Sequence, residues 1–233
     1  METLAAFVRE RAPRKLERQP VAEETDDPDD HGTSDEPART DVEAALTVIG
    51  RRETGREAEH QRIDLRETNL DGLELPGARL AGARLTLASM SYANLIGTDL
   101  RGADLTAADM SFAYLSKAQL SGAETRKVDL TYASLQDADL QDANLEESVL
   151  LGADLSDADL KGANLFKAIL SEAKLAGADL TGANLEGADL SGADLTDADG
   201  ITEDQLQSAH ARKDSPPRLP IGLEHVQLIP GTK

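Results

Sequence analysis

Apolar and polar positions follow one another along most of this chain with a period of five residues. Leucine stands at every fifth position from Leu65 to Leu195, and the exceptions among these 27 positions are Met90, Met110 and Thr125. A period of five matches neither the 3.6 residues per turn of an α-helix nor the two-residue period of a β-strand. The pattern therefore predicts a supersecondary coil that repeats without insertion or deletion.

Each unit of the repeat has a fixed arrangement of small, polar and apolar residues. Alanine stands two positions before the leucine in most units, as in Ala103-Asp104-Leu105. Residues two apart in a short extended segment point to the same side, so alanine and leucine are predicted to face a common core and the intervening Asp or Asn to face outward. The next two residues turn the chain, and glycine fills 12 of these turn positions, Gly102 and Gly182 among them.

These units resemble those of a known family. Ala153-Asp154-Leu155, Ala163-Asn164-Leu165 and Ala178-Asp179-Leu180 resemble the consensus Ala-(Asp/Asn)-Leu-X-X of the pentapeptide repeat proteins, and the resemblance covers about 135 of the 233 residues. It implies an all-β solenoid, namely a right-handed quadrilateral β-helix in which four pentapeptides make a coil of 20 residues. Neighbouring coils would then stack about 4.8 Å apart.

The segments outside the repeat predict short α-helices at both ends of the solenoid. Capping boxes at Thr40/Glu43 and Thr202/Gln205 mark the starts of two of these helices, and a helix through about Ala211 is expected at the second. Covers are needed because the ends of a solenoid expose unpaired backbone and core leucines. We divide the chain into a short N-terminal helix (1–18), a disordered acidic linker (19–39), a capping helix with its lead-in (40–60), the β-helix (61–200), and a C-terminal capping helix with an extended tail (201–233).

The 20-residue coil places residues 20 apart in one column. Tyr92, Phe112 and Tyr132 form an outward aromatic ladder of this kind, and it is flanked by a row of Ser91, Ser111 and Thr131. Such a ladder either stiffens one face, or lies beneath a terminal segment, or forms an exposed stripe that binds a protein partner.

Carboxylates form a second kind of column. Asp139, Asp159 and Asp179 are 20 apart, and like charges so close are tolerated when each carboxylate accepts a backbone hydrogen bond at its turn. The alternative interpretation is a stripe that binds a cation or a basic partner. Asn144, Asn164 and Asn184 form a neutral column whose amides are expected to hydrogen-bond along the stack.

Charge and composition narrow the classes of function. The net charge of −20 argues against direct binding of nucleic acid or of anionic membranes. With no cysteine, no signal peptide and no apolar run long enough to span a membrane, the chain is expected to be cytoplasmic. The four histidines lie outside the repeat without metal-ligand spacing, so we expect no catalytic residue, no cofactor and no metal site.

The sequence thus favours a non-catalytic, rigid scaffold for protein–protein interaction, with Tyr92, Phe112 and Tyr132 and the aspartate column as candidate contacts; neither the partner nor the oligomeric state follows from it. The alternative is an inhibitor or protector of DNA gyrase that mimics DNA, as the family resemblance allows. Residues 131–195 carry a net charge of −10, whereas residues 61–130 carry −1, so half of the rod has the charge such a mimic needs. Against it, no central residue of the repeat is aromatic, no loop projects from the coils, and residues 201–211 contain only Ile201 and Leu206 as large apolar residues.

A last resemblance concerns the first residues. The segments 4–13 and 40–52 resemble sequence upstream of the repeat in larger bacterial pentapeptide repeat proteins, in which a membrane-anchored region precedes them. This resemblance implies a shortened relative of such proteins or a start codon assigned too late.

Overall fold

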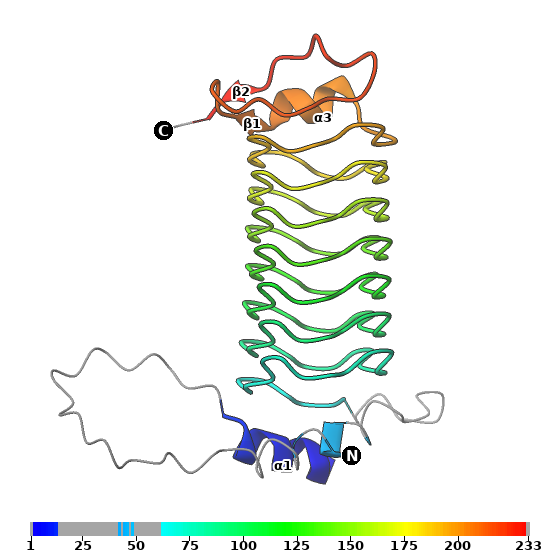
Figure 1. The fold of residues 1–233 in the computed structure, drawn as a ribbon, viewed down its shortest axis with the longest axis vertical. Coiled ribbons are helices and arrows are strands. Elements are labelled where there is room, and N and C mark those ends of the chain that lie inside the picture. Colours follow the sequence, from blue (N-terminus) through cyan, green and yellow to red (C-terminus); the bar gives the residue numbers. More distant parts are fainter. Residues whose placement is uncertain (1, 14–41, 43, 47, 49–61, 232–233) are drawn as a thin grey trace, which may run out of the picture.

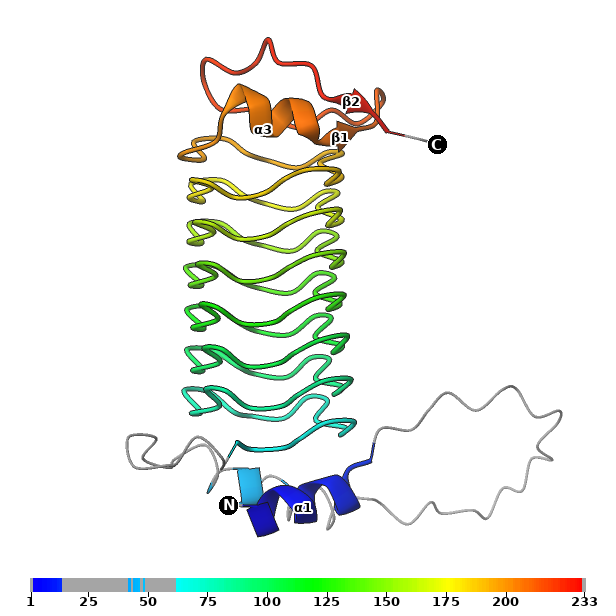
Figure 2. The same ribbon diagram turned by 180° about the vertical axis from the view of Figure 1, so that it is seen from behind.

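The computed structural model describes residues 2–13, 42, 44–46, 48 and 62–231. A stack of coils occupies the middle of the chain, and helical segments lie across both of its ends (Figure 1). The named elements are α1 (Glu2–Arg11) at the N-terminal end, and α3 (Glu203–Ser208), β1 (His210–Ala211) and β2 (Ile229–Pro230) at the C-terminal end. Figure 2 shows the same arrangement from behind.

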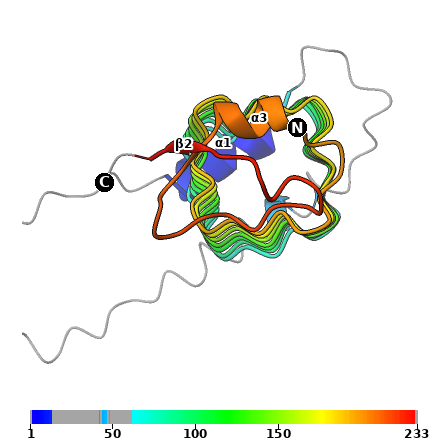
Figure 3. The same ribbon diagram turned by 90° about the horizontal axis from the view of Figure 1, so that it is seen from above.

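Each coil contains 20 residues. Parallel backbone bridges join residue i to residue i+20 in an unbroken series that begins with Asp64 and Arg84 and ends with Asp179 and Asp199. Because the pentapeptide unit divides this interval into four, every coil has four sides, and the view along the stack shows successive coils lying over one another with a four-sided outline (Figure 3). The columns expected from the sequence are therefore real columns of the structure.

The core is built from the leucines and alanines of the repeat. Met90 and Met110 take leucine positions and are buried like their neighbours, at 0% and 1% exposure. Thr125 is the one polar residue at such a position, and its hydroxyl donates to the backbone oxygen of Asn144 at 2.8 Å. A buried hydroxyl costs little once it has a partner, so Thr125 does not interrupt the coil.

The corners are turns whose second residue has a positive φ. The leucine carbonyl accepts from the amide of the residue directly after the two turn residues, as in Ala83 N to Leu80 O at 3.0 Å. The positive-φ residue donates to the next coil, as in Tyr92 N to Ser111 O at 3.0 Å. Backbone groups at the corners are thus paired within and between coils. This pairing leaves the side chains at the second turn position free to point away from the core.

The N-terminal end of the stack is covered by α1. Ala5 and Val8 are buried, and the chain beyond the helix pairs with the first coil, where Asn69 N donates to Ala12 O at 2.6 Å. The side chain of Arg9 donates to the carbonyl oxygen of Asp64 at 2.6 Å. The capping box expected at Thr40 and Glu43 and the predicted linker 19–39 lie outside the described residues.

The C-terminal end is covered by α3. The capping box at Thr202 and Gln205 is present, as the sequence predicts. The amide of Gln205 also donates to the carbonyl oxygens of Leu180 and Ala183, at 3.1 and 2.8 Å, so one side chain caps both the helix and the last coil.

The segment after α3 continues the ladder of the stack. The helix ends at Ser208, earlier than expected, because His210 leaves it to pair with Asp189 of the last coil. The tail is also less extended than its prolines predict, since Ile229 turns back to pair with His210 as β2 on β1. Together these segments cover the apolar end of the core.

Candidate protein-interaction surface

The aromatic ladder expected from the 20-residue period is formed. The ring centroids of Tyr92 and Phe112 are 4.9 Å apart with an interplanar angle of 3°, and those of Phe112 and Tyr132 are 5.6 Å apart at 26°. These spacings follow the distance between coils, because each ring projects from the same corner of successive coils. The rings therefore stack face to face along the rod.

The ladder is exposed to solvent. Tyr92 is 58% exposed, Tyr132 50% and Phe112 39%, so no described terminal segment covers it. All three residues have φ between +54° and +59°, a region that bulky side chains enter at a cost of about 1–2 kcal/mol each. Stacking offsets part of this cost, by about 0.5–1.5 kcal/mol per pair. The chain thus keeps exposed rings at corner positions where glycine would suit the fold better.

The ladder belongs to a larger uncharged area, which we call the aromatic patch. It consists of the segments 91–96, 111–116 and 131–136, which lie one above another in three successive coils. The patch adds Tyr114, which is 52% exposed, and Ile96, which is 42% exposed. None of its residues is charged, although 29% of the chain is. Tyr114 is not among the residues predicted from the sequence. Three segments 20 residues apart that contain no charged residue are the sequence signal that marks its position.

Carboxylates surround the aromatic patch. They are Asp71, Glu74, Asp109, Asp129, Asp137 and Asp154, and we call them the acidic rim. Lys117 is the one basic residue at the same positions around the patch. Among the described residues, no ion pair involves Asp109, Asp129 or Asp137, whereas Asp154 pairs with Lys174 at 3.3 Å. The patch is thus neutral and aromatic at its centre and negative at its edge.

The aspartate column on another face is organised differently. As expected, the carboxylates of Asp139, Asp159 and Asp179 each accept a backbone hydrogen bond, from the amide two residues further on at 3.0–3.1 Å. Lys161 lies between two of them, with Nζ 3.2 Å from Oδ2 of Asp159 and 2.7 Å from Oδ2 of Asp179. The hydrogen bond from Lys161, with those from Thr181, lowers the pKa of Asp179 to about 2. The column's charge is therefore partly neutralised within the rod, which makes it a weaker candidate contact than the aromatic patch.

The asparagine column is structural. Nδ2 of Asn164 donates to Oδ1 of Asn144 at 3.1 Å, and Nδ2 of Asn184 donates to Oδ1 of Asn164 at 3.0 Å. At the lower end Asn144 donates to Glu124 at 3.0 Å. The amides hydrogen-bond along the stack as the sequence predicts, and their hydrogen-bonding groups are directed at one another.

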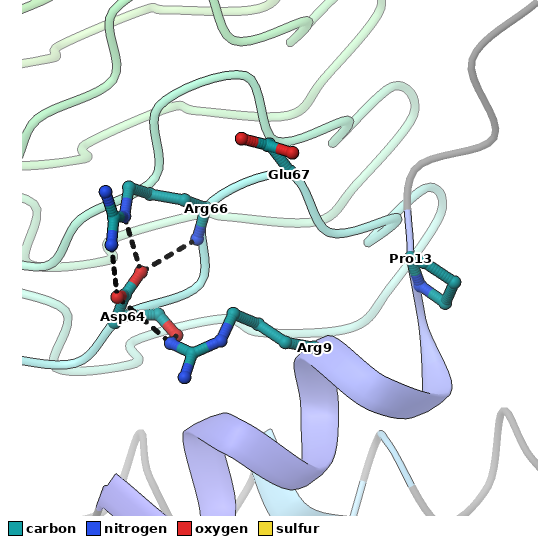
Figure 4. A pocket seen from close by; sticks show the side chains of 5 residues that line it. All are labelled: Arg9, Pro13, Asp64, Arg66 and Glu67. Carbon is teal, nitrogen blue, oxygen red and sulfur yellow. Dashed lines mark hydrogen bonds and ion pairs between the residues drawn. The ribbon is translucent and has the colours of Figure 1, made fainter.

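A pocket of about 470 Å³ opens where α1 meets the first coil, lined by Arg9, Pro13, Asp64, Arg66 and Glu67 (Figure 4). Asp64 is at its centre: Arg66 binds it at 2.8 Å and Arg9 at 3.1 Å. The hydrogen bond from Arg66 is the largest cause of a pKa of about 2 at Asp64. Because two guanidinium groups hold its carboxylate, Asp64 ties α1 to the first coil.

Two further features concern the described residues only. No helix among them is long and apolar enough to cross a membrane. Within the same part of the chain, no group of three or more His, Cys, Asp or Glu side chains is placed to hold a metal ion.

Comparison with known proteins identifies the class to which this coil belongs. The family model for pentapeptide repeats matches the chain with 8 copies, over residues 56–86, 63–102, 88–131, 129–165 and 168–199. These ranges cover more than half of the sequence, so the chain belongs to the pentapeptide repeat proteins.

Solved structures of this family resemble the chain in sequence or in fold. HetL, a pentapeptide repeat protein involved in heterocyst differentiation regulation from the cyanobacterium Nostoc sp. strain PCC 7120, is 33% identical over 67% of this chain and 76% of its own, with a TM-score of 0.44. QnrB1, a plasmid-mediated fluoroquinolone resistance protein, is 22% identical over 66% of this chain and 79% of its own, with a TM-score of 0.56. The likeness to QnrB1 shows a shared fold. No protein of curated function matches the sequence significantly.

Proposed function

We propose that this protein is a non-catalytic scaffold whose rigid β-helix presents the aromatic patch to a protein partner. The observation that carries the proposal is the exposure of four aromatic side chains in an uncharged area of a chain with a net charge of −20. Exposed aromatic residues with charge excluded from the centre are typical of protein-binding surfaces. The family resemblance further implies a right-handed coil, and the lack of cysteine fits a cytoplasmic location.

The rigidity of the coil supports this role. Every coil is hydrogen-bonded to the next through its backbone, and the core leucines and alanines are almost fully buried. Side chains at the corners therefore keep fixed spacings without contact to a partner. A surface that is ordered before binding loses little conformational entropy on binding.

The test is a pull-down that compares the wild-type chain with the variant Tyr92→Gly/Phe112→Gly/Tyr132→Gly. Glycine suits the positive φ of these corners, so the variant keeps the coil and removes only the rings. The matched control is Ala107→Gly/Lys127→Gly/Glu147→Gly, which changes three stacked corner residues of another column, at φ of 54° to 56°, and leaves the net charge unchanged. We expect the partner to be recovered with the wild type and the control but lost with the ladder variant. Recovery with all three would refute the proposal.

A second candidate function is the protection or inhibition of DNA gyrase by mimicry of DNA. It is favoured by the fold shared with a fluoroquinolone resistance protein and by the net charge of −10 over residues 131–195. The pairing of Lys161 with Asp159 and Asp179 weakens it, because the mimic would need those charges unpaired. A DNA gyrase supercoiling assay with this protein added at micromolar concentration tests this second function. Supercoiling that is unchanged by the protein would rule it out.

A further inference from the structure

The spacing of the aromatic ladder selects the kind of element that can lie on it. The three ring centroids follow one another at 4.9 and 5.6 Å, so the outer two are roughly 10.5 Å apart along the rod. An α-helix rises about 1.5 Å per residue, which puts residues i, i+3 or i+4, and i+7 about 4.5–6 Å and 10.5 Å along its axis. These distances match the ladder ring by ring.

An extended segment does not match in the same way. Alternate residues of a β-strand that point to one side lie about 6.8 Å apart, so the third would lie about 13.6 Å from the first. Its side chains would lose register with the rings within the length of the ladder. A helix that lies parallel to the rod can instead place one apolar residue beside each of Tyr92, Phe112 and Tyr132.

The acidic rim indicates the charge of this helix. Along one side of the patch, parallel to the rod, lie Asp109 and Asp129, and neither has an ion pair with any described residue. The opposite side has no net charge, because Lys117 and Asp137 stand one coil apart in the same column. A helix with lysine or arginine on the flank of its apolar stripe that faces Asp109 and Asp129 would place cations opposite these carboxylates. A second copy of this chain, at a net charge of −20, would on balance be repelled by these carboxylates.

We propose that the aromatic patch binds one basic amphipathic α-helix of a partner protein, oriented parallel to the rod, with apolar residues at i, i+3 or i+4, and i+7 on the ladder. This inference rests on the proposed function and adds to it the secondary structure, direction and charge of the partner's contact. Binding of an amphipathic helix by its apolar stripe is a common mode of protein recognition.

Fluorescence anisotropy with synthetic peptides tests the inference in buffer of about 0.15 M salt. The probe is an 18-residue fluorescein-labelled peptide of leucine and lysine, with leucine at helical spacing. We expect it to bind the wild-type chain about 30-fold more tightly than Tyr92→Gly/Phe112→Gly/Tyr132→Gly, the loss typical of a set of anchoring contacts. Because the ladder variant keeps the net charge, equal affinity for both would mean unspecific electrostatic binding and would overturn the proposal.

The rim has its own matched pair of variants. Asp109→Asn/Asp129→Asn removes two rim charges, and Asp139→Asn/Asp159→Asn removes two charges from the other face; both sets keep an oxygen that can accept the turn hydrogen bond. We expect the rim variant to bind the helical peptide several-fold more weakly and with a smaller dependence on salt, and the other to bind like the wild type. Equal weakening by both variants would contradict the assignment of the cationic flank.

Two more measurements separate the alternatives. A peptide of the same composition with strictly alternating leucine and lysine should bind about tenfold more weakly, and tighter binding of it would overturn the helical mode. Sedimentation that shows dimers of the wild type but not of the ladder variant would make a second copy the occupant and overturn the inference. If the helical and the alternating peptide bind equally while the partner in the pull-down is still lost with the ladder variant, the helix inference fails and the proposed function stands.

Discussion

The ring of Tyr132 lies over Gly152, which stands 20 residues further on in the same column. A Cβ atom added to Gly152 would be 2.3 Å from Cε1 of that ring, closer than such atoms approach one another. The ladder therefore ends at Gly152 for a physical reason, since any side chain there would displace the ring below it. The same corner position holds an aromatic residue in three coils and glycine in the fourth, where the ring of Tyr132 occupies the place of a Cβ atom.

This relationship predicts the effect of Gly152→Ala. Alanine at φ of +62° costs about 1–2 kcal/mol by itself, and the contact with Tyr132 adds about 1–3 kcal/mol. Gly122→Ala is the matched control, because Gly122 has φ of +63° and nothing within 4 Å of the added Cβ. Urea unfolding should show Gly152→Ala to be the less stable of the two. Equal midpoints would mean that the ring moves aside without cost.

The asparagine column predicts a pH-dependent effect of Asn164→Asp. An ionised carboxylate cannot donate to Oδ1 of Asn144, so two acceptors would face each other, at a cost of about 1–3 kcal/mol at pH 7. This contact raises the pKa of the introduced carboxyl in the folded state, so the penalty is present above that pKa and disappears as the pH falls below it. Thermal unfolding at pH 7 and near pH 4 measures it. The difference from the wild type should shrink at the lower pH, and a constant difference would contradict the explanation.

The link between α1 and the first coil predicts when the helix loosens in acid. The pKa of Asp64 is lowered from 3.8 to about 2 in the folded protein, so its contribution to stability is present above pH 4 and is lost as the pH falls through 2. Hydrogen exchange of the α1 amides should stay slow at pH 4 and become faster between pH 4 and pH 2, after correction for intrinsic rates. Asp64→Asn should loosen α1 already at pH 7.

Asp99→Asn is the control for this prediction. Asp99 binds Arg101 at 2.8 Å in the same local arrangement as Asp64 and Arg66, but it has no hydrogen bond or ion pair with α1. Exchange in α1 should be unaffected by it. Faster exchange in both variants would mean that the coil as a whole is loosened and that the contact of Arg9 with Asp64 does not hold the helix.

Lys161, which lies between Asp159 and Asp179, allows us to predict how the pKa of Asp179 responds to its removal. Lys161→Gln removes the group that contributes most to the low pKa of Asp179, so that pKa should rise from about 2 toward 3.8. Carboxyl chemical shifts followed by NMR between pH 1.5 and pH 6 measure the change. Lys174→Gln, which affects Asp154 on another face, should leave Asp179 as it is. An unchanged pKa in Lys161→Gln would show that Thr181 alone stabilises the carboxylate.

Much of the fold follows from the order of residues, because each five-residue unit has the same arrangement of small, polar and apolar residues and therefore adopts the same local structure. Leucine at every fifth position and the family resemblance predict the coil, and the period of 20 predicts which side chains stack. The amide contacts of Asn144, Asn164 and Asn184 were predictable for this reason: neighbours in a column are neighbours at one fixed interval in the sequence. The capping box of Thr202 and Gln205 was predictable because it depends on four consecutive residues.

Contacts between columns and between the ends and the coil follow from no such interval. Lys161 stands two residues after Asp159, as Arg66 does after Asp64, but its second contact, with Asp179 of the next coil, is made by a turn residue of one coil with a column residue of another. Arg9 meets Asp64 across 55 positions of sequence, through the docking of α1 on the first coil. The pairing of His210 with Asp189 likewise depends on the residue at which α3 ends and on where the chain then runs across the last coil.

The sequence by itself thus determined the coil, its core and the identity of the columns, because backbone hydrogen bonding at a constant interval converts position in the chain into position in space. Only the tertiary structure decided which columns are exposed and which are neutralised. Tyr92, Phe112 and Tyr132 stand in solvent, while the charge of Asp159 and Asp179 is shared with Lys161. Exposure and ion pairing depend on how side chains from different faces and from the two ends are arranged around the rod, and a one-dimensional period does not contain that information.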